Sequence, residues 1–101
     1  PLASREKKSL RHIAHHLDSV VAVGDQGVSA GVLAETERAL TDHELIKVKL
    51  AIGDRALRAS AAEQLADACT AEIVQSIGKV VVLYRANPDA DPRLSNILRY
   101  S

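Results

Sequence analysis

Two glycines separated by two residues, Gly24 and Gly27, are the local feature with the clearest chemical meaning. Glycine lets the backbone approach a ligand closely and turn its amides outward, so a phosphate could bind there. Ser29 would open the helix that follows, and the dipole of that helix would favour an anion. The alternative is a tight connection that needs glycine only for its backbone angles. A third glycine and a Gly-Lys-Ser/Thr sequence are both missing, so neither a dinucleotide fingerprint nor a P-loop is indicated.

Histidines near the N-terminus form a second group with possible chemistry. His12 and His16 have the i, i+4 spacing that can place two imidazoles on one metal ion, and His15 lies between them. No cysteine is nearby, and a third ligand such as His43 would have to come from elsewhere. Histidines at a helix end also suit the negative pole of the dipole and can meet phosphate. We therefore predict no metal and no cofactor, with a small metal-dependent enzyme kept as an alternative.

The remaining reactive groups do not form a catalytic set. Cys69 falls on the predicted buried stripe of a helix, where a thiol behaves as a small hydrophobe. Asp89 and Asp91 lie in a proline-containing segment, where a fixed separation of two carboxylates is hard to maintain. The sequence therefore predicts a protein that is not an enzyme.

Basic residues are distributed so that they could form one phosphate-contacting face. Lys47 and Lys49 project from the same side of a predicted strand, because side chains alternate along a strand. Exposed lysines are also common at sheet edges, where they deter aggregation. The full candidate face consists of Arg5, Lys8, Arg11, Lys47, Lys49 and Lys79.

Apolar residues at spacings of three and four predict three amphipathic helices that position these groups. Their predicted N-caps are Ser4, Ser29 and Asp54. The first helix covers residues 5–16, the second ends near Asp42, and the third ends around Thr70. Glu37 of the second helix is expected to face water. The inner side of the third helix is expected to comprise Ala61, Leu65, Ala68 and Cys69.

Four short segments have the composition of strands. A β-branched run over residues 20–23 predicts a buried strand. Residues 45–51 alternate, with one apolar face and one exposed, lysine-bearing face. Residues 72–77 and 80–85 are rich in β-branched residues and only two residues apart, which predicts an antiparallel hairpin.

The order α-β-α-β-α-β-β indicates a single α/β domain with a mixed four-stranded sheet and packed helices. Strands joined through a helix are expected to pair in parallel, and the final hairpin must be antiparallel. A chain of 101 residues has room for one core. Prolines and acidic residues follow Arg85 and break any regular element, so we expect a domain over residues 1–86 and a tail over residues 87–101 that is mobile or depends on a partner. The only later regularity in this tail is the spacing of Leu94, Ile97 and Leu98.

Composition narrows the setting in which the chain works. Hydrophobic residues make up 47% of it, and its net charge is zero, which argues against indiscriminate coating of nucleic acid. The charge is segregated, however, because both ends of the chain are basic and residues 17–42 are acidic. A single cysteine and the lack of a secretory signal lead us to expect a cytoplasmic location. The longest apolar run, residues 80–84, is too short to cross a bilayer.

Several strings of residues occur together over roughly residues 4–86. The most specific are His-Glu-Leu-Ile-Lys-Val-Lys, residues 43–49, and Ile-Gly-Lys and Leu-Tyr-Arg in the hairpin. The others are His15 and Leu17, Val20-Val21, Gly24-x-x-Gly27 and Gly31-Val32-Leu33. Together they resemble one family, the CRM (chloroplast RNA splicing and ribosome maturation) domain, and within it the bacterial YhbY-like proteins.

This resemblance implies an RNA-binding α/β domain similar to the C-terminal domain of bacterial translation initiation factor three. Stand-alone members look like assembly factors of the large ribosomal subunit. The positions that it implies for RNA contact are Gly24, Asp25, Gln26 and Gly27 in the loop, Lys47 and Lys49 on the strand, and Lys79 and Arg85 in the hairpin. The loop departs from the family by carrying Asp25, whose charge should repel phosphate.

The leading hypothesis is a non-catalytic protein that binds ribosomal RNA, or a precursor of the large subunit, during assembly. Its partner would be a structured RNA read by shape, with no membrane and no small-molecule substrate. The alternative from another class is a protein-interaction module whose sheet or tail docks onto a partner.

Overall fold

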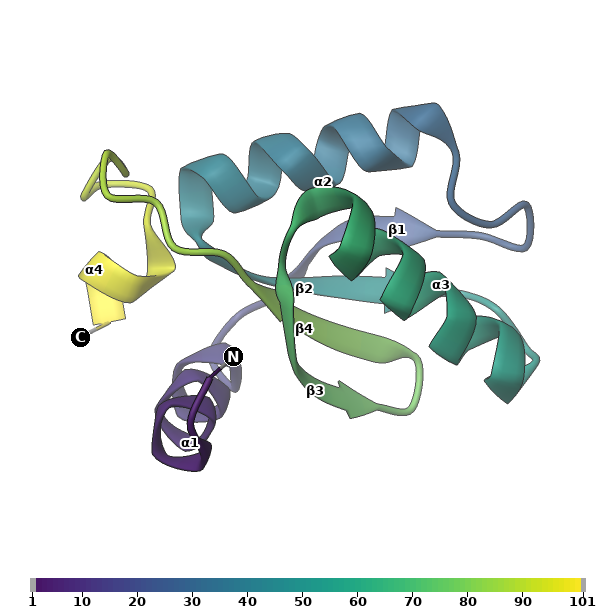
Figure 1. Ribbon diagram of the computed structural model, residues 1–101, viewed down its shortest axis with the longest axis horizontal. Helices are drawn as coiled ribbons and strands as arrows, with labels where there is room; N and C mark the ends of the chain where they lie inside the picture. Colours follow the sequence, from purple (N-terminus) through teal and green to yellow (C-terminus); the bar gives the residue numbers. More distant parts are fainter. Residues whose placement is uncertain (1, 101) are drawn as a thin grey trace.

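The computed structural model describes residues 2–100, so residues 1 and 101, the outer ends of the two predicted segments, lie outside the described part (Figure 1). The predicted element order is confirmed, and a short helix follows it. No helix in this described part combines the length and apolarity needed to cross a membrane. The elements are α1 (Ser4–Ala14), β1 (Ser19–Val23), α2 (Ala30–His43), β2 (Leu45–Leu50), α3 (Arg55–Cys69), β3 (Glu72–Ile77), β4 (Val80–Tyr84) and α4 (Asn96–Tyr100).

Two of the three predicted helix caps are confirmed. The Ser29 hydroxyl accepts a hydrogen bond from the Val32 amide (3.1 Å), and the Asp54 carboxylate accepts one from the Leu57 amide (3.0 Å). The prediction for Ser4 is wrong, because Ser4 is already helical and Ala3 occupies the cap position without a side-chain acceptor.

The first helix is also shorter at its end than the predicted 5–16. It ends at Ala14, because the following backbone tightens into three-residue turns in which the His16 amide bonds the Ile13 carbonyl (3.1 Å) and the Leu17 amide bonds the Ala14 carbonyl (3.0 Å).

The sheet has the strand order β1-β2-β4-β3. β1 and β2 are parallel as predicted, and the β3-β4 hairpin is antiparallel as predicted. The prediction that all helix-linked strands pair in parallel is wrong for β2 and β3, because β4 lies between them and pairs antiparallel with both. The apolar strand β4 gains burial at this inner position, whereas β3, with Gln75 and Ser76, forms an edge.

The two faces of the sheet are covered unequally (Figure 1). Helices α2 and α3 pack on one face over the larger hydrophobic core, which includes Val48, Val81 and Leu83. Helix α1 packs on the other face over a smaller cluster that includes Leu45 and Val82. The alternation in sequence had suggested that the lysine-bearing face of β2 is exposed. In the structure, α1 covers part of this face.

The buried stripe of α3 differs from the prediction by one position. Ala61, Leu65 and Cys69 are buried as expected, but Ala68 is exposed. Ala62 and Ala66 are buried in its place. The buried residues recur at intervals of four, which keeps them on one side of the helix.

The segment after β4 packs against the α2–β2 junction, and α4 forms there over Ile97 and Leu98, two of the three residues whose regular spacing the sequence shows. Glu44, buried and at a positive φ of 63°, organises this contact. Its carboxylate accepts hydrogen bonds from the Asn87 amide (2.7 Å) and from the Ser95 hydroxyl. The side-chain amide of Asn96 also donates to the Leu45 backbone carbonyl (2.7 Å). The division at residue 86 and the mobility of the tail stay predictions.

Replacing Glu44 with alanine should test whether this contact holds the tail. The change leaves the Asn87 amide and the buried Ser95 hydroxyl without their acceptor, so we expect unfolding free energy to fall by about 1–3 kcal/mol. Glu63→Ala, at an exposed position of α3, is the control and should change little. Urea unfolding gives the free energies, and hydrogen exchange at Asn87 reports the tail. Equal stability of the two variants, with unchanged exchange at Asn87, would contradict this role.

Candidate functional site

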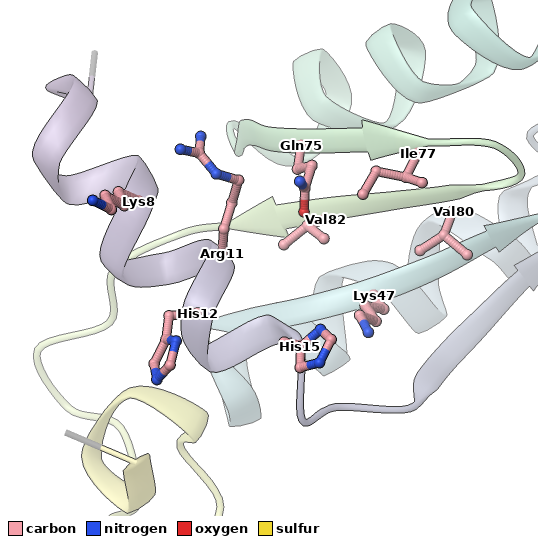
Figure 2. Close-up of a pocket in the computed structure, with 9 residues that line it drawn as sticks. All are labelled: Lys8, Arg11, His12, His15, Lys47, Gln75, Ile77, Val80 and Val82. Carbon is pink, nitrogen blue, oxygen red and sulfur yellow. The ribbon is translucent and has the colours of Figure 1, made fainter.

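A cleft of about 620 Å³ lies between α1 and the part of the sheet that α1 leaves uncovered. Three of its lining residues come from α1, His15 follows directly after the helix, and the other five come from the strands β2, β3 and β4 (Figure 2). Valine and isoleucine side chains form part of the strand side, and cations come from both the helix and β2. The lining residues are Lys8, Arg11, His12, His15, Lys47, Gln75, Ile77, Val80 and Val82.

The charge of this cleft is one-sided. Lys8, Arg11 and Lys47 line it, and the described residues of its lining include no carboxylate. Within residues 2–100 the ion pairs join Arg85 to Glu37 and Arg93 to Asp91, so none of them neutralises the cleft cations. Three uncompensated cations around one hollow create a positive potential that attracts anions.

Lys47 is held in position by the backbone that follows α1. Its ammonium group donates to the Leu17 carbonyl at 3.0 Å, and its side chain is half-buried. An ammonium has three donors, so two remain for a ligand. Lys49 lies on the same face of β2 and is exposed, opposite Val80 in the register. The two lysines therefore differ, because Lys47 is pre-positioned inside the cleft and Lys49 is free at its border.

The glycine loop lies at the other end of the sheet, away from α1 (Figure 1). The Gly27 amide donates to the Gly24 carbonyl at 2.9 Å, which closes a tight turn with Asp25 and Gln26 exposed at its corners. Gly27 has a φ of +79°, so the turn itself requires a glycine there. Gly24 has no such angle, and a Cβ added to it would meet nothing within 4 Å. The fold therefore explains Gly27 but not Gly24.

The hairpin turn carrying Lys79 lies at this same end of the sheet. The Leu50 amide donates to the Lys79 carbonyl (2.6 Å), and the Ala51 amide donates to the Val23 carbonyl (2.7 Å). These bonds join the ends of β1, β2 and β4. Lys79 therefore lies at the same end of the sheet as the glycine loop, and neither lines the cleft.

Arg85 differs from the other predicted contacts because protein groups occupy its guanidinium. It forms an ion pair with Glu37 (2.8 Å) and donates to the Cys69 carbonyl (2.8 Å) and the Thr41 hydroxyl (2.9 Å). These partners lie on α2 and α3, the helices of the opposite face. Glu37, which was expected to face water, is half-exposed and serves this pair. The geometry favours a structural role for Arg85.

The structure brings together only part of the predicted contact set. Lys8, Arg11 and Lys47 meet in the cleft, and Lys49 lies at its border. Arg5 is exposed on α1 but does not line the cleft. The sequence interpretation missed the strand residues of the cleft. Those residues are Gln75, Ile77, Val80 and Val82. The signal that the sequence did offer was Ile77, an apolar residue directly before the Gly78-Lys79 turn.

The histidines do not converge on one point. His12 and His16 have ring centroids 5.8 Å apart, in an edge-to-face arrangement. His43, the third ligand considered, instead donates through Nδ1 to the Leu94 carbonyl (2.8 Å) near the C-terminal segment. Between residues 2 and 100 no three histidine, cysteine or acidic side chains cluster as metal ligands would.

Cys69, the last residue of α3, points into the larger core, with 1% of its surface exposed. Burial raises the pKa of its thiol, and the neighbouring Glu37 carboxylate raises it further. Because the thiolate is the reactive form, this environment suppresses nucleophilic chemistry.

Comparison with known proteins identifies close relatives of the whole chain. Residues 2–85 match the CRS1 / YhbY (CRM) domain. A probable RNA-binding protein of Pseudomonas aeruginosa is 47% identical over 100 residues, which cover 99% of this chain and 96% of that protein. An RNA-binding protein of Haemophilus influenzae is 43% identical over 93 residues, which cover 92% and 94%. The solution structure of a hypothetical Staphylococcus aureus protein is similar with a TM-score of 0.79 and 30% identity, covering 90% and 95%.

The two loop glycines should respond differently to alanine. Gly24→Ala should leave the unfolding free energy within about 0.5 kcal/mol of wild type, because the Cβ would enter open space. Gly27→Ala should cost about 1–2 kcal/mol, because alanine resists a positive φ. Chemical denaturation of the two variants measures the difference. Equal losses would show that the turn needs both glycines for its fold.

Native Cys69 should react slowly with iodoacetamide near pH 8. Its raised pKa lowers the thiolate fraction, and burial blocks access to the sulfur. The same protein unfolded in urea is the control and should react at the rate of a free cysteine. A native rate equal to the unfolded rate would contradict the buried placement.

Proposed function

This chain belongs to the CRS1 / YhbY (CRM) domain family, and from that membership we propose that it is a non-catalytic RNA-binding protein acting on ribosomal RNA during assembly of the large subunit. The single observation that carries the proposal is the cleft beside α1, whose three cations have no acidic partner among residues 2–100. Relatives that match nearly the whole chain are named RNA-binding proteins, which supports the same partner here.

In this proposal, phosphate groups of RNA bind Lys8, Arg11 and Lys47 in the cleft and Lys49 at its border. Such contacts release condensed counterions, which gives favourable binding even for a protein without net charge. The tether from Lys47 to the Leu17 carbonyl reduces the entropy that the side chain loses when a phosphate binds. The neutral sum of charges, with cations gathered on one face, suits one oriented contact with a structured RNA.

The glycine loop would form a second contact with RNA at the end of the sheet away from α1, where Lys79 also lies. The open space at Gly24 would let an RNA backbone approach the chain directly. The amino-terminal end of α2, capped by Ser29, follows the loop and places the positive end of the helix dipole there. Asp25 opposes a phosphate there, so we assign the larger share of affinity to the cleft lysines.

A cytoplasmic location fits this function.

The second candidate function is a protein-interaction module. The observation in its favour is the exposed apolar side chains of the C-terminal segment, Leu94, Leu98 and Tyr100. It would not require the cleft cations to bind RNA.

The two candidates are separated by Lys47→Gln/Lys49→Gln. Glutamine removes the charge, is one atom shorter than lysine and keeps a polar NH₂ donor at the half-buried position 47, so folding should be preserved. Binding to ribosomal RNA and large-subunit precursors is measured across a salt series. Each lost phosphate contact should lower the slope of log affinity against log salt by about 0.7–0.9.

Arg38→Gln/Arg93→Gln is the matched control, since it removes the same charge from exposed positions on α2 and in the C-terminal segment. We expect this pair to keep nearly the affinity and slope of wild type. If the lysine pair also keeps them, the RNA proposal fails and the interaction module takes its place.

A further inference from the structure

A bulge in β3 decides where Gln75 points. Ile73 pairs with Leu83 and Gln75 pairs with Val82, so Val74 is an extra residue in the register. Ile73 packs on the α2 and α3 face, whereas Val74 is buried on the α1 face. Regular alternation would return Gln75 to the side of Ile73. The bulge instead places Gln75 on the same face as Val74, inside the cleft (Figure 2).

The side-chain amide of Gln75 is available to a ligand. Gln75 is half-buried, and within residues 2–100 its amide has no hydrogen-bond partner. An amide presents a carbonyl acceptor beside an NH₂ donor, the pairing that matches the donor and acceptor edge of a base. The bulge therefore aims an unused recognition group into a cationic cleft.

The strand side of the cleft beside Gln75 is apolar. Ile77 is 63% exposed, and Val80 and Val82 line the same hollow. Contact with the flat face of a ligand would remove this surface from water. A phosphate alone would leave it uncovered, and an acidic side chain of a peptide has no flat apolar face to cover it.

We propose that the cleft binds one unpaired nucleotide of an RNA strand, with its base against Ile77 and its base edge hydrogen-bonded to Gln75. Lys8, Arg11 and Lys47 would hold the adjoining phosphates. The cleft volume of about 620 Å³ lies within the range of ligand pockets, roughly 300–1,000 Å³. This inference rests on the proposed function, and it adds that the RNA must present an unstacked base, because a paired base cannot offer its face or its pairing edge.

The test measures binding of short single-stranded oligo-A, oligo-U and oligo-C and of a blunt RNA duplex, each fluorescently labelled, at one salt concentration. Gln75→Leu keeps the side-chain size but removes the amide. We expect it to lower affinity for the preferred single strand about fivefold or more and to bring the three homopolymers closer together. Duplex affinity and the salt slope should stay at wild-type values, because no charge is removed.

Two further variants keep the result interpretable. Ile77→Ser alters an exposed side chain, so folding should survive, and it should weaken every single strand without affecting the duplex. Ser76→Ala, on the opposite face of the same strand, is the matched control and should bind as wild type. In the folded wild-type protein, the side-chain amide resonance of Gln75 should shift when the preferred single strand is added and stay in place with the duplex.

The outcomes separate this inference from the function on which it rests. If Gln75→Leu and Ile77→Ser bind every RNA as wild type does, while Lys47→Gln/Lys49→Gln loses affinity, the nucleotide site is overturned and RNA binding stands. If the wild-type protein binds no RNA above an unrelated neutral protein, the proposed function itself fails. If Gln75→Leu or Ile77→Ser lowers affinity for the duplex as much as for the single strands, the requirement for an unpaired base is also overturned.

Discussion

The placement of β4 between β2 and β3 is the constraint on which the rest of the structure depends. Val81 and Leu83 of this strand pack beneath α2 and α3, and Val82 packs on the α1 side, so the strand is buried on both faces. An apolar strand gains most from such a position. Its two neighbours then become antiparallel partners, and β3 becomes an edge whose bulge can redirect a side chain without breaking a central ladder.

Unequal covering of the sheet follows from this arrangement and produces the cleft. Helices α2 and α3 bury the strand residues on one face, whereas on the other face α1 covers the region near Leu45 and Ile97 of α4 packs against the same cluster. The remaining surface stays open beside a helix whose outward residues include Lys8 and Arg11. The same helix therefore closes part of the core and supplies part of the cationic wall.

Lys47 and Arg85 are both half-buried cations, and their hydrogen-bond partners decide how they differ. Arg85 extends toward α2 and α3, where Glu37, Thr41 and the Cys69 carbonyl satisfy its guanidinium. Such a group would need to break charge-assisted bonds before binding RNA. Lys47 has a carbonyl partner and, in the part of the chain that the structure describes, no carboxylate partner, so its charge stays available.

The sequence by itself determined the features that depend on short-range patterns. Periodicity and caps such as Ser29 and Asp54 predicted the helices, two residues between apolar runs predicted the hairpin, and alternation placed Lys47 and Lys49 on one face. Only the tertiary structure decided the position of β4, the pairing of Arg85 with Glu37, the tail contact through Glu44 and the direction of Gln75. Local propensity does not encode these, because each depends on packing between segments that are distant along the chain or on a one-residue shift in strand register.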